Sequence, residues 1–444
     1  MKTCQIKYSK ITLCLILLLI AGQVSAQDHS DVKSMTLQEV FDLALQNSTQ
    51  LKIAKKGSDL ARQQTAIEKN RRLPSVSTEL NYGYLSDANI WTPSFSTHET
   101  RPMPHHLTQF STTASQLISS GNALNNSIKK SSLEEQVAEF SQDKSTVDIK
   151  FQVAANYLDI YRLTNLKKVY QSNLKLAENR LRNVLSMQKQ GMVTQNDVLR
   201  TELSISDLKL KIRTTDNSID IVNQQMNTII GLPDSSRLAP DSTFLANYVH
   251  NNTFENFRSQ AYQINPELKI ASTENKIAET NIKLLQSEKL PVIALFAANN
   301  FQRPFLNSLP AIDVYYNVWQ AGIGIRYNIS SLYQSPKKIT AGKIALQQSQ
   351  QKEILQKQNI DVAISTYYTR YIEAQEDLQT YKSDLKSAQE NYRIVEKKYF
   401  NQLALLTDMI DAANIKLEAE TKVTDASINV VFTYCQLLNS IGNL

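Results

Sequence analysis

The chain has 444 residues, with 48 Lys and Arg against 42 Asp and Glu, and 42% of its residues are apolar. Only 10 residues are glycine, far below the usual share of about 7%, which argues against Gly-rich phosphate loops and most all-β folds. Residues 105–232 and 337–444 contain no proline. Since an ordinary globular helix averages about 11–12 residues, these two runs without a helix breaker predict long helical hairpins.

The first 26 residues predict a secretory signal peptide. Lys2, Lys7 and Lys10 precede an apolar run at residues 11–21, and the small residues of a cleavage site follow at 24–26. The three lysines account for half of the formal net charge of +6, so the charge gives no support to nucleic-acid binding. We therefore expect an exported chain that begins near residue 27 and has no nucleic-acid partner.

An internal duplication organises the remaining chain. The sequence LKIA at residues 51–54 and the Leu-Pro pair at 73–74 recur 217 positions later, at 268–271 and 290–291. Asp197 and Ile230-Gly231 recur at an offset of 211, as Asp408 and Ile441-Gly442. These matches predict a first structural repeat over residues 27–231, a connector over 232–253 and a second repeat over 254–444.

Each repeat is expected to contain two helices, a pair of strands and a long helical hairpin. The first repeat predicts helices at about 37–47 and 49–72, strands at 75–84 and about 107–117 around a turn-rich stretch, and a hairpin at about 121–231, with its limbs at about 125–190 and 195–231. The second repeat predicts strands at 292–299 and 318–327 around a loop at 305–315, and a hairpin at about 336–444. The two strand pairs occupy about residues 75–118 and 291–329.

The predicted strands alternate apolar and polar residues and are about ten residues long, which suits strands that cross a bilayer. Trp319 and Tyr327 lie at the ends of one strand, as aromatic side chains do at a membrane interface. Four strands cannot close a barrel, and open strand edges are not tolerated in hydrocarbon. Other copies of the chain must therefore complete the sheet.

The chain resembles the TolC-type outer membrane efflux proteins, also called outer membrane factors. The resemblance rests on the expected export signal, the duplicated LKIA and Leu-Pro motifs, the turn Gly191-x5-Asp197-Val198-Leu199, its copy at residues 408–412, and the Ile-Gly-Leu-Pro ending at 230–233. Each motif alone is weak. Their order, duplication and spacing together cover nearly all of the expected mature chain.

The resemblance implies a mainly α fold with a small β part. Long α-helical hairpins of three chains would form a periplasmic barrel, and four strands per chain would join a shared 12-stranded transmembrane β-barrel. It implies a bacterial outer membrane protein that extends into the periplasm and works with outer-membrane lipid, a periplasmic adaptor (membrane fusion) protein and an inner-membrane transporter. The implied function is the passive exit duct of a tripartite efflux pump, gated at the periplasmic tip.

Two other functions remain open at this point. The same fold would serve as the exit duct of a type I protein secretion system. A different class, an exported coiled-coil structural protein without a channel, is disfavoured by the alternating strands. The five histidines have no zinc-binding spacing, and we find no phosphate loop or nucleophile motif. We therefore expect no enzyme activity, no cofactor and no metal site.

Asp408 and Asp411 are the main candidates for a periplasmic gate. Their spacing of three places both carboxylates on one helix face. The alternatives to a gate are a solvated helix face, or aspartates favoured near a helix N-terminus by the macrodipole. The resemblance implies that they form stacked carboxylate rings at a narrow pore, which would attract cations. Leu405 stands where the first repeat has a capping Thr194, so we expect that capping does not explain Asp408.

Asp197 and Tyr399 complete the expected gate. Asp197 is either a gate residue or the second half of a capping box with Thr194. The resemblance assigns Tyr399 to a tyrosine that ties neighbouring helices together, and ordinary coiled-coil packing is the alternative. Ala404 stands where the family usually has an arginine, so a gate latch that depends on that arginine is absent here unless Arg200 substitutes for it.

The two hairpin turns are expected to contact the adaptor, and a plain turn would satisfy the same pattern. The tip residues are Gly191, Met192, Val193, Gln402, Leu403 and Ala404. The second turn departs from the family, which usually has glycine where this chain has Gln402.

Overall fold

The structure is a computed structural model that describes residues 32–242 and 253–444. The signal peptide predicted at residues 1–26 lies outside the described residues, and so does much of the predicted connector. The chain divides into two compact units. Unit 1 comprises Met1–Thr49, Ile149–Asn251 and Tyr367–Leu437, and unit 2 comprises Gln50–Asp148, Asn252–Thr366 and Leu438–Leu444.

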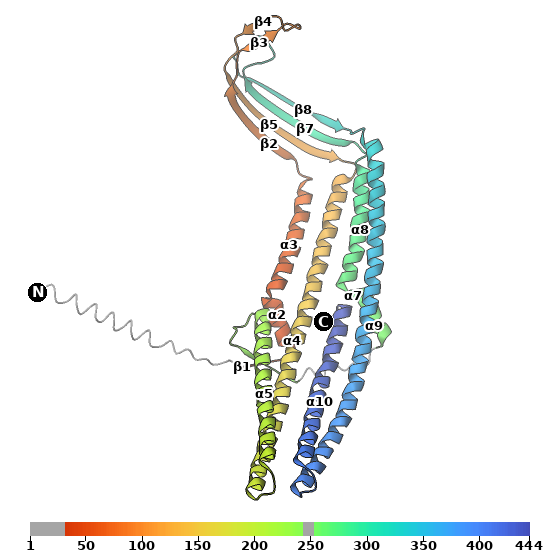
Figure 1. Cartoon of the computed structure of the whole chain (residues 1–444). Helices are drawn as coiled ribbons and strands as arrows, with labels where there is room; N and C mark the ends of the chain where they lie inside the picture. Colours follow the sequence, from red (N-terminus) through yellow and green to blue (C-terminus); the bar gives the residue numbers. More distant parts are fainter. Residues whose placement is uncertain (1–31, 243–252) are drawn as a thin grey trace, which may run out of the picture. The chain divides into compact units, whose positions relative to one another are not determined.

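The same order of elements occurs twice along the chain (Figure 1). The first series is α2 (Leu37–Asn47), α3 (Thr49–Asn70), β2 (Ser75–Tyr84), β5 (His106–Ser119), α4 (Ala123–Lys189) and α5 (Gln195–Ile230). The second is α7 (Phe254–Ile264), α8 (Pro266–Ser287), β7 (Val292–Arg303), β8 (Tyr316–Arg326), α9 (Ser331–Phe400) and α10 (Leu406–Ile441). The prediction of a mainly α fold with a small β part is confirmed. Where one repeat ends and the next begins stays a prediction.

None of the helices in the described parts of the chain is apolar enough over a sufficient length to cross a membrane.

Two helices end on glycines that the sequence places at matching positions. Gly231 follows α5 with φ 73°, and its N–H donates to the Asn227 carbonyl at 2.8 Å. Gly442 follows α10 with φ 81°. A Cβ at Gly231 would lie 2.8 Å from Asn47 Cβ, and one at Gly442 would lie 2.8 Å from Pro266 Cδ. Both positions therefore need glycine for backbone conformation and for space.

Several boundaries differ from the prediction. Helix α9 begins at Ser331, five residues before the predicted 336, and holds Pro336 inside it. The turn-rich stretch contains a short hairpin of β3 (Ala88–Trp91) and β4 (His98–Arg101). Strand β1 (Val32–Met35) pairs in parallel with β6 (Arg237–Pro240), which lies within the predicted connector. These short pairs depend on partners distant in sequence or on local hydrogen bonds, so periodicity does not reveal them.

Unit 2 contains an antiparallel sheet in the order β2-β5-β7-β8. Directly paired residues share a face, and the register Val76–Ala114–Ala297–Ala321 defines one of the two faces. The large exposed apolar side chains on this face are Val76, Leu80, Tyr82, Tyr84, Phe110, Leu295, Phe301, Trp319, Ile323 and Ile325. The opposite face carries mostly polar residues, including Ser77 and Thr113, whose hydroxyls are 2.7 Å apart.

Buried side chains pack between the helices of unit 1, and one of them, Tyr157, also fixes the short strand pair. Tyr157 of α4 is fully buried, and its hydroxyl donates to the Met35 carbonyl at 2.8 Å and accepts from the Asp241 N–H at 3.0 Å. Burial raises the pKa of Tyr157. This tyrosine ties the β1–β6 pair to the long helix, because β1 ends at Met35 and Asp241 follows β6.

Candidate functional site

The candidate site is the tip of unit 1, which we define as the α4–α5 turn at residues 190–194, the α9–α10 turn at 401–405 and the helix ends beside them. In the first turn, Gly191 N–H donates to Gln188 O at 2.9 Å and Met192 N–H to Met187 O at 2.9 Å. In the second, Gln402 N–H donates to Tyr399 O at 2.9 Å and Leu403 N–H to Lys398 O at 2.8 Å. All four pairs correspond at an offset of 211, so the two turns have the same backbone path.

Left-handed backbone is required at one position of each turn. Gly191 has φ 73° and Gln402 has φ 63°. Glycine adopts this conformation freely, whereas a side chain is strained there. Gln402, which stands where the family usually has glycine, is therefore the strained residue of the second turn.

The aspartates of the first helical turn cap their own helices. Asp197 accepts from the Thr194 N–H and hydroxyl, both at 2.8 Å, and Thr194 Oγ1 accepts from the Asp197 N–H at 3.3 Å. The predicted capping box is present. Asp408 Oδ2 accepts from the Leu405 N–H at 3.0 Å, so the expectation that capping does not explain Asp408 is wrong. A carboxylate three residues into the helix caps the backbone N–H whether or not the N-cap side chain returns the bond.

Tyr399 lies inside the apolar cluster beneath the turns. It is 4% exposed and packs with Val184, Val198, Leu406 and Met409. Its hydroxyl has no hydrogen-bond partner within the described parts of the chain. Burial raises the pKa of Tyr399, and the negative charge of Asp197 raises it further. The contacts of Tyr399 within one chain are thus those of the packing alternative.

Asp408 and Asp411 are both exposed. Asp411 and Arg200 line the same groove of about 430 Å³ between α5 and α10, together with Asp207 and Thr407. Arg200 is also exposed and forms no ion pair with any residue that the structure describes. The structure therefore places Arg200 in the same groove as one of the predicted gate acids, Asp411, and leaves the guanidinium without an ion-pair partner among the described residues.

The predicted adaptor-contacting residues separate into two groups. Met192 is 54% and Leu403 75% exposed, whereas Val193 and Ala404 pack against the apolar cluster. Gln402 Nε2 donates to Met192 Sδ at 3.5 Å and links the two turns. Leu405, which the sequence analysis did not include among the tip residues, is 70% exposed. The sequence did carry a signal that Leu405 is exposed. The residue directly precedes α10 and does not share the helical spacing of the buried apolar residues.

A buried polar layer above the tip was not predicted. Arg180 of α4 is 5% exposed, and one of its nitrogens donates to the Tyr392 hydroxyl at 3.4 Å. Tyr392 of α9 in turn donates to Glu396 Oε1 at 2.7 Å. Another guanidinium nitrogen, Arg180 Nε, is buried and has no hydrogen-bond partner among the described residues. A guanidinium in this setting is costly unless hydrogen bonds satisfy it, so this layer fixes how α4 and α9 pack.

A second part of the layer joins α4 to α10. Asn173 Nδ2 donates to Glu420 Oε2 at 2.6 Å, and Lys416 lies 3.5 Å from the same carboxylate group. Asn173 and Arg180 are seven residues apart and share a helix face with Ala177 and Val184. This heptad spacing was the available signal, because it places polar residues in the seam between helices.

Residues 40–232 match the family model described as outer membrane efflux protein. This part of the chain is an outer membrane efflux protein domain. The resemblance to the TolC-type family is thereby confirmed. A curated relative, the outer membrane efflux protein BepC of Brucella suis biovar 1 (strain 1330), is 22% identical over 297 residues. That alignment covers 66% of this chain and 63% of BepC.

Solved outer-membrane channels share the fold over nearly the whole chain. The OprN channel is 13% identical with a TM-score of 0.77, covering 92% of this chain and 90% of OprN. CusC is 14% identical with a TM-score of 0.79, covering 92% of each chain. VceC of Vibrio cholerae is 12% identical with a TM-score of 0.76, covering 92% of this chain and 96% of VceC. At these identities the likeness shows a common fold.

Proposed function

We propose that three copies of this chain form an outer-membrane channel that is the passive exit duct of a tripartite efflux pump. The duct would extend into the periplasm, be gated at the tip and receive substrate from an inner-membrane transporter through a periplasmic adaptor. The efflux family and the shared channel fold support this proposal. The observation that carries it is the four-stranded sheet of unit 2.

The sheet is incomplete in a single chain in two respects. Its apolar face exposes large side chains such as Leu80, Trp319 and Ile323, each more than 60% accessible, and such a surface is unfavourable in water. Its outer strands, β2 and β8, each have a free edge among the described strands. A bilayer covers the apolar face, and only another strand satisfies the edges there.

The strand directions allow closure by identical copies. Neighbouring strands are antiparallel throughout the order β2-β5-β7-β8, so β8 of one copy runs antiparallel to β2 of the next. A cyclic arrangement repeats this contact until the ring closes. Three copies would give the 12 strands that the resemblance implies.

The gate in this proposal consists of Asp408 and Asp411 from each copy, with Tyr399 and Asp197 holding the helices that carry them. Exposed carboxylates repeated by symmetry around a narrow opening attract cations. Met192, Leu403 and Leu405 would supply the apolar contacts to the adaptor, because they are the large exposed apolar residues of the turns.

A matched pair of charge substitutions on β8 tests the channel. Ile323→Arg places a charge on the apolar face, and Gln320→Arg places the same charge on the polar face three residues away. A charge at mid-bilayer costs about 2–4 kcal/mol on the lipid side, whereas a lumen position tolerates it. We expect Ile323→Arg to abolish assembled, membrane-inserted trimers and Gln320→Arg to retain them and their conductance in planar bilayers.

The measurements are native mass in detergent and single-channel conductance. A folded monomer that stays in solution without detergent, with Ile323→Arg behaving like the parent chain, would overturn the proposal and favour the structural coiled-coil alternative.

A further inference from the structure

Helices α4, α9 and α10 of unit 1 line an open cavity of about 610 Å³. Its lining comes from Ala155 to Arg162 on α4, Asp377 and Tyr381 on α9, and Lys422 to Phe432 on α10. This cavity shares no residue with the tip or with the polar layer described above. Its volume falls within the range of about 300–1,000 Å³ of small-molecule sites.

One wall of the cavity is apolar and held in place. Leu158, Ala426 and Ile428 line it and are buried. Phe432 lies beside them, with its ring centroid 6.0 Å from that of Phe151. A preformed apolar wall of this kind binds the flat body of an organic molecule without first having to reorganise.

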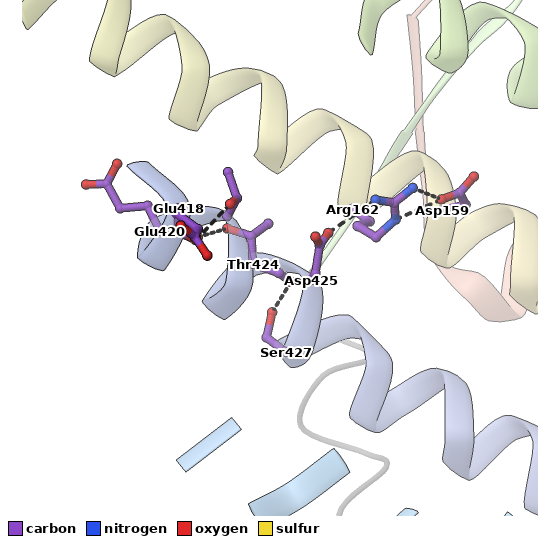
Figure 2. Close-up of polar contacts among 8 residues, drawn as sticks. Asp159, Arg162, Glu418, Glu420, Thr424, Asp425 and Ser427 are labelled. Atoms are coloured by element: carbon purple, nitrogen blue, oxygen red, sulfur yellow. Dashed lines mark hydrogen bonds and ion pairs between the residues drawn. The ribbon is translucent and has the colours of Figure 1, made fainter. Parts of the chain in front are cut away.

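The rim of the cavity is negatively charged. Arg162 Nη2 lies 2.7 Å from Asp159, and Nη1 lies 3.2 Å from Asp425 on α10 (Figure 2). One guanidinium therefore faces two carboxylates, which leaves an excess negative charge. Asp377, also on the rim, forms no ion pair with any residue in the described ranges. A cation entering the cavity gains attraction, and an anion is repelled.

An ammonium group already occupies the aromatic face at this rim. Lys422 Nζ lies 6.0 Å from the centroid of the Tyr381 ring and 2.7 Å from Glu418. The tyrosine face thus interacts with a positive charge by the cation–π geometry. Because Lys422 is an exposed, flexible side chain that retains Glu418 as a partner, a ligand cation can take its place over the ring.

We propose that this cavity binds an organic cation with a flat apolar body. The body would lie against Leu158, Ile428 and Phe432, and the charge would face Asp377 and the Tyr381 ring. The inference does not depend on the channel function, because every group that it uses comes from unit 1 of one chain.

Ethidium is a suitable probe, since it is a flat monovalent cation whose fluorescence rises in apolar surroundings. The full chain would be titrated in nanodiscs of zwitterionic lipid, with empty nanodiscs subtracted. We expect Asp377→Asn to weaken binding about tenfold through loss of a nearby opposite charge. The matched control is Glu376→Gln, which removes the same charge from the adjacent residue outside the cavity lining and should leave the affinity unchanged.

Two further measurements establish the chemical class of the ligand. Lys422→Gln removes the internal competitor over Tyr381, so it should tighten ethidium binding about threefold or more. The anion 8-anilinonaphthalene-1-sulfonate should fail to displace ethidium from the parent chain. Equal weakening by Asp377→Asn and Glu376→Gln, or displacement by the anion, would overturn the proposal. Channel conductance of Asp377→Asn should equal that of the parent chain, so failure here is distinguishable from failure of the channel proposal.

Discussion

The two hairpin turns of unit 1 have one backbone path and different side chains. The first has Gly191 in the left-handed position and the second has Gln402. The first closes a reciprocal capping box through Thr194, whereas Leu405 leaves the second with only the carboxylate half. The comparison shows that the backbone path of the turn is determined by the unpaired N–H and C=O groups at the helix ends, which need hydrogen-bond partners. The side chains then change the stability of the turn without changing its path.

The acidic residues of the two turns differ in their exposure to solvent. Asp197 of the first turn is half-buried and bonded to Thr194 through its backbone and its hydroxyl. Asp408 and Asp411 of the second turn are exposed. Asp197 and Asp408 both accept from a backbone N–H at the start of their helices, so the second turn differs in that its capping carboxylate is exposed and in carrying a second exposed carboxylate, Asp411. Four predictions sharpen this comparison or break it.

Tyr399 gives the largest expected effect, because it fills the apolar cluster shared by both turns. Tyr399→Ala leaves a cavity and should lower the local free energy of opening at the tip by about 3 kcal/mol. Tyr399→Phe should change it by less than about 0.5 kcal/mol, since the hydroxyl has no partner among the described residues. Hydrogen exchange of amides at the end of α9 measures both. A loss of 1 kcal/mol or more with Phe would show that the hydroxyl bonds to a neighbouring copy.

The exposed acids give the next effect. Asp408→Asn combined with Asp411→Asn should reduce block by trivalent cations in planar bilayers about tenfold and weaken cation selectivity, because the carboxylate rings of the proposed gate would lose their charge. Asp197→Asn is the control, and it should lower tip stability while leaving block unchanged. Unchanged block and reversal potentials in the double variant would remove these aspartates from the pore.

The capping difference predicts opposite effects of two substitutions. Thr194→Ala removes the reciprocal cap of α5 and should lower the local stability of its first turn by about 1 kcal/mol. Leu405→Thr adds the missing half at α10 and should raise its stability by a few tenths to about 1 kcal/mol. Hydrogen exchange at the start of each helix reports these values. Equal losses in both variants would mean that the exposed Leu405 contributes packing that the cap does not replace.

Relief of the left-handed strain in the second turn gives the smallest effect. Gln402→Gly relieves a strained φ of 63° and should stabilise the second turn by about 0.5 kcal/mol. The reverse change in the first turn, Gly191→Ala, should destabilise it by about 1 kcal/mol, although a Cβ there meets no neighbouring atom within 4 Å. Protease resistance of the two turns provides the readout. A destabilising Gln402→Gly would assign a larger role to the contact with Met192.

Periodicity located the regular elements closely. The strand predicted at 75–84 is β2, and the helix predicted from Thr49 to 72 is α3, which ends at Asn70. A long stretch in which apolar residues recur with one period is compatible with only one type of secondary structure, because the apolar residues must lie on one face in order to be buried together. The candidate site was found less completely. Thr194, Asp197 and the turn glycine carried local signals. The heptad spacing of Asn173 and Arg180 lies within a polar run, and only the packing of the helices showed that both side chains are buried.

The sequence by itself determined the duplicated order of elements, the long helices without breakers and the two hairpin turns, because these follow from local backbone preferences and from repeated motifs. Only the tertiary structure decided that Tyr399 lies in an apolar cluster and that Arg162 joins α4 to α10. Those facts depend on which side chains meet across helices far apart in the chain. Helical spacing predicts which face of a helix a side chain lies on, but only the packing of the helices determines which residue it contacts.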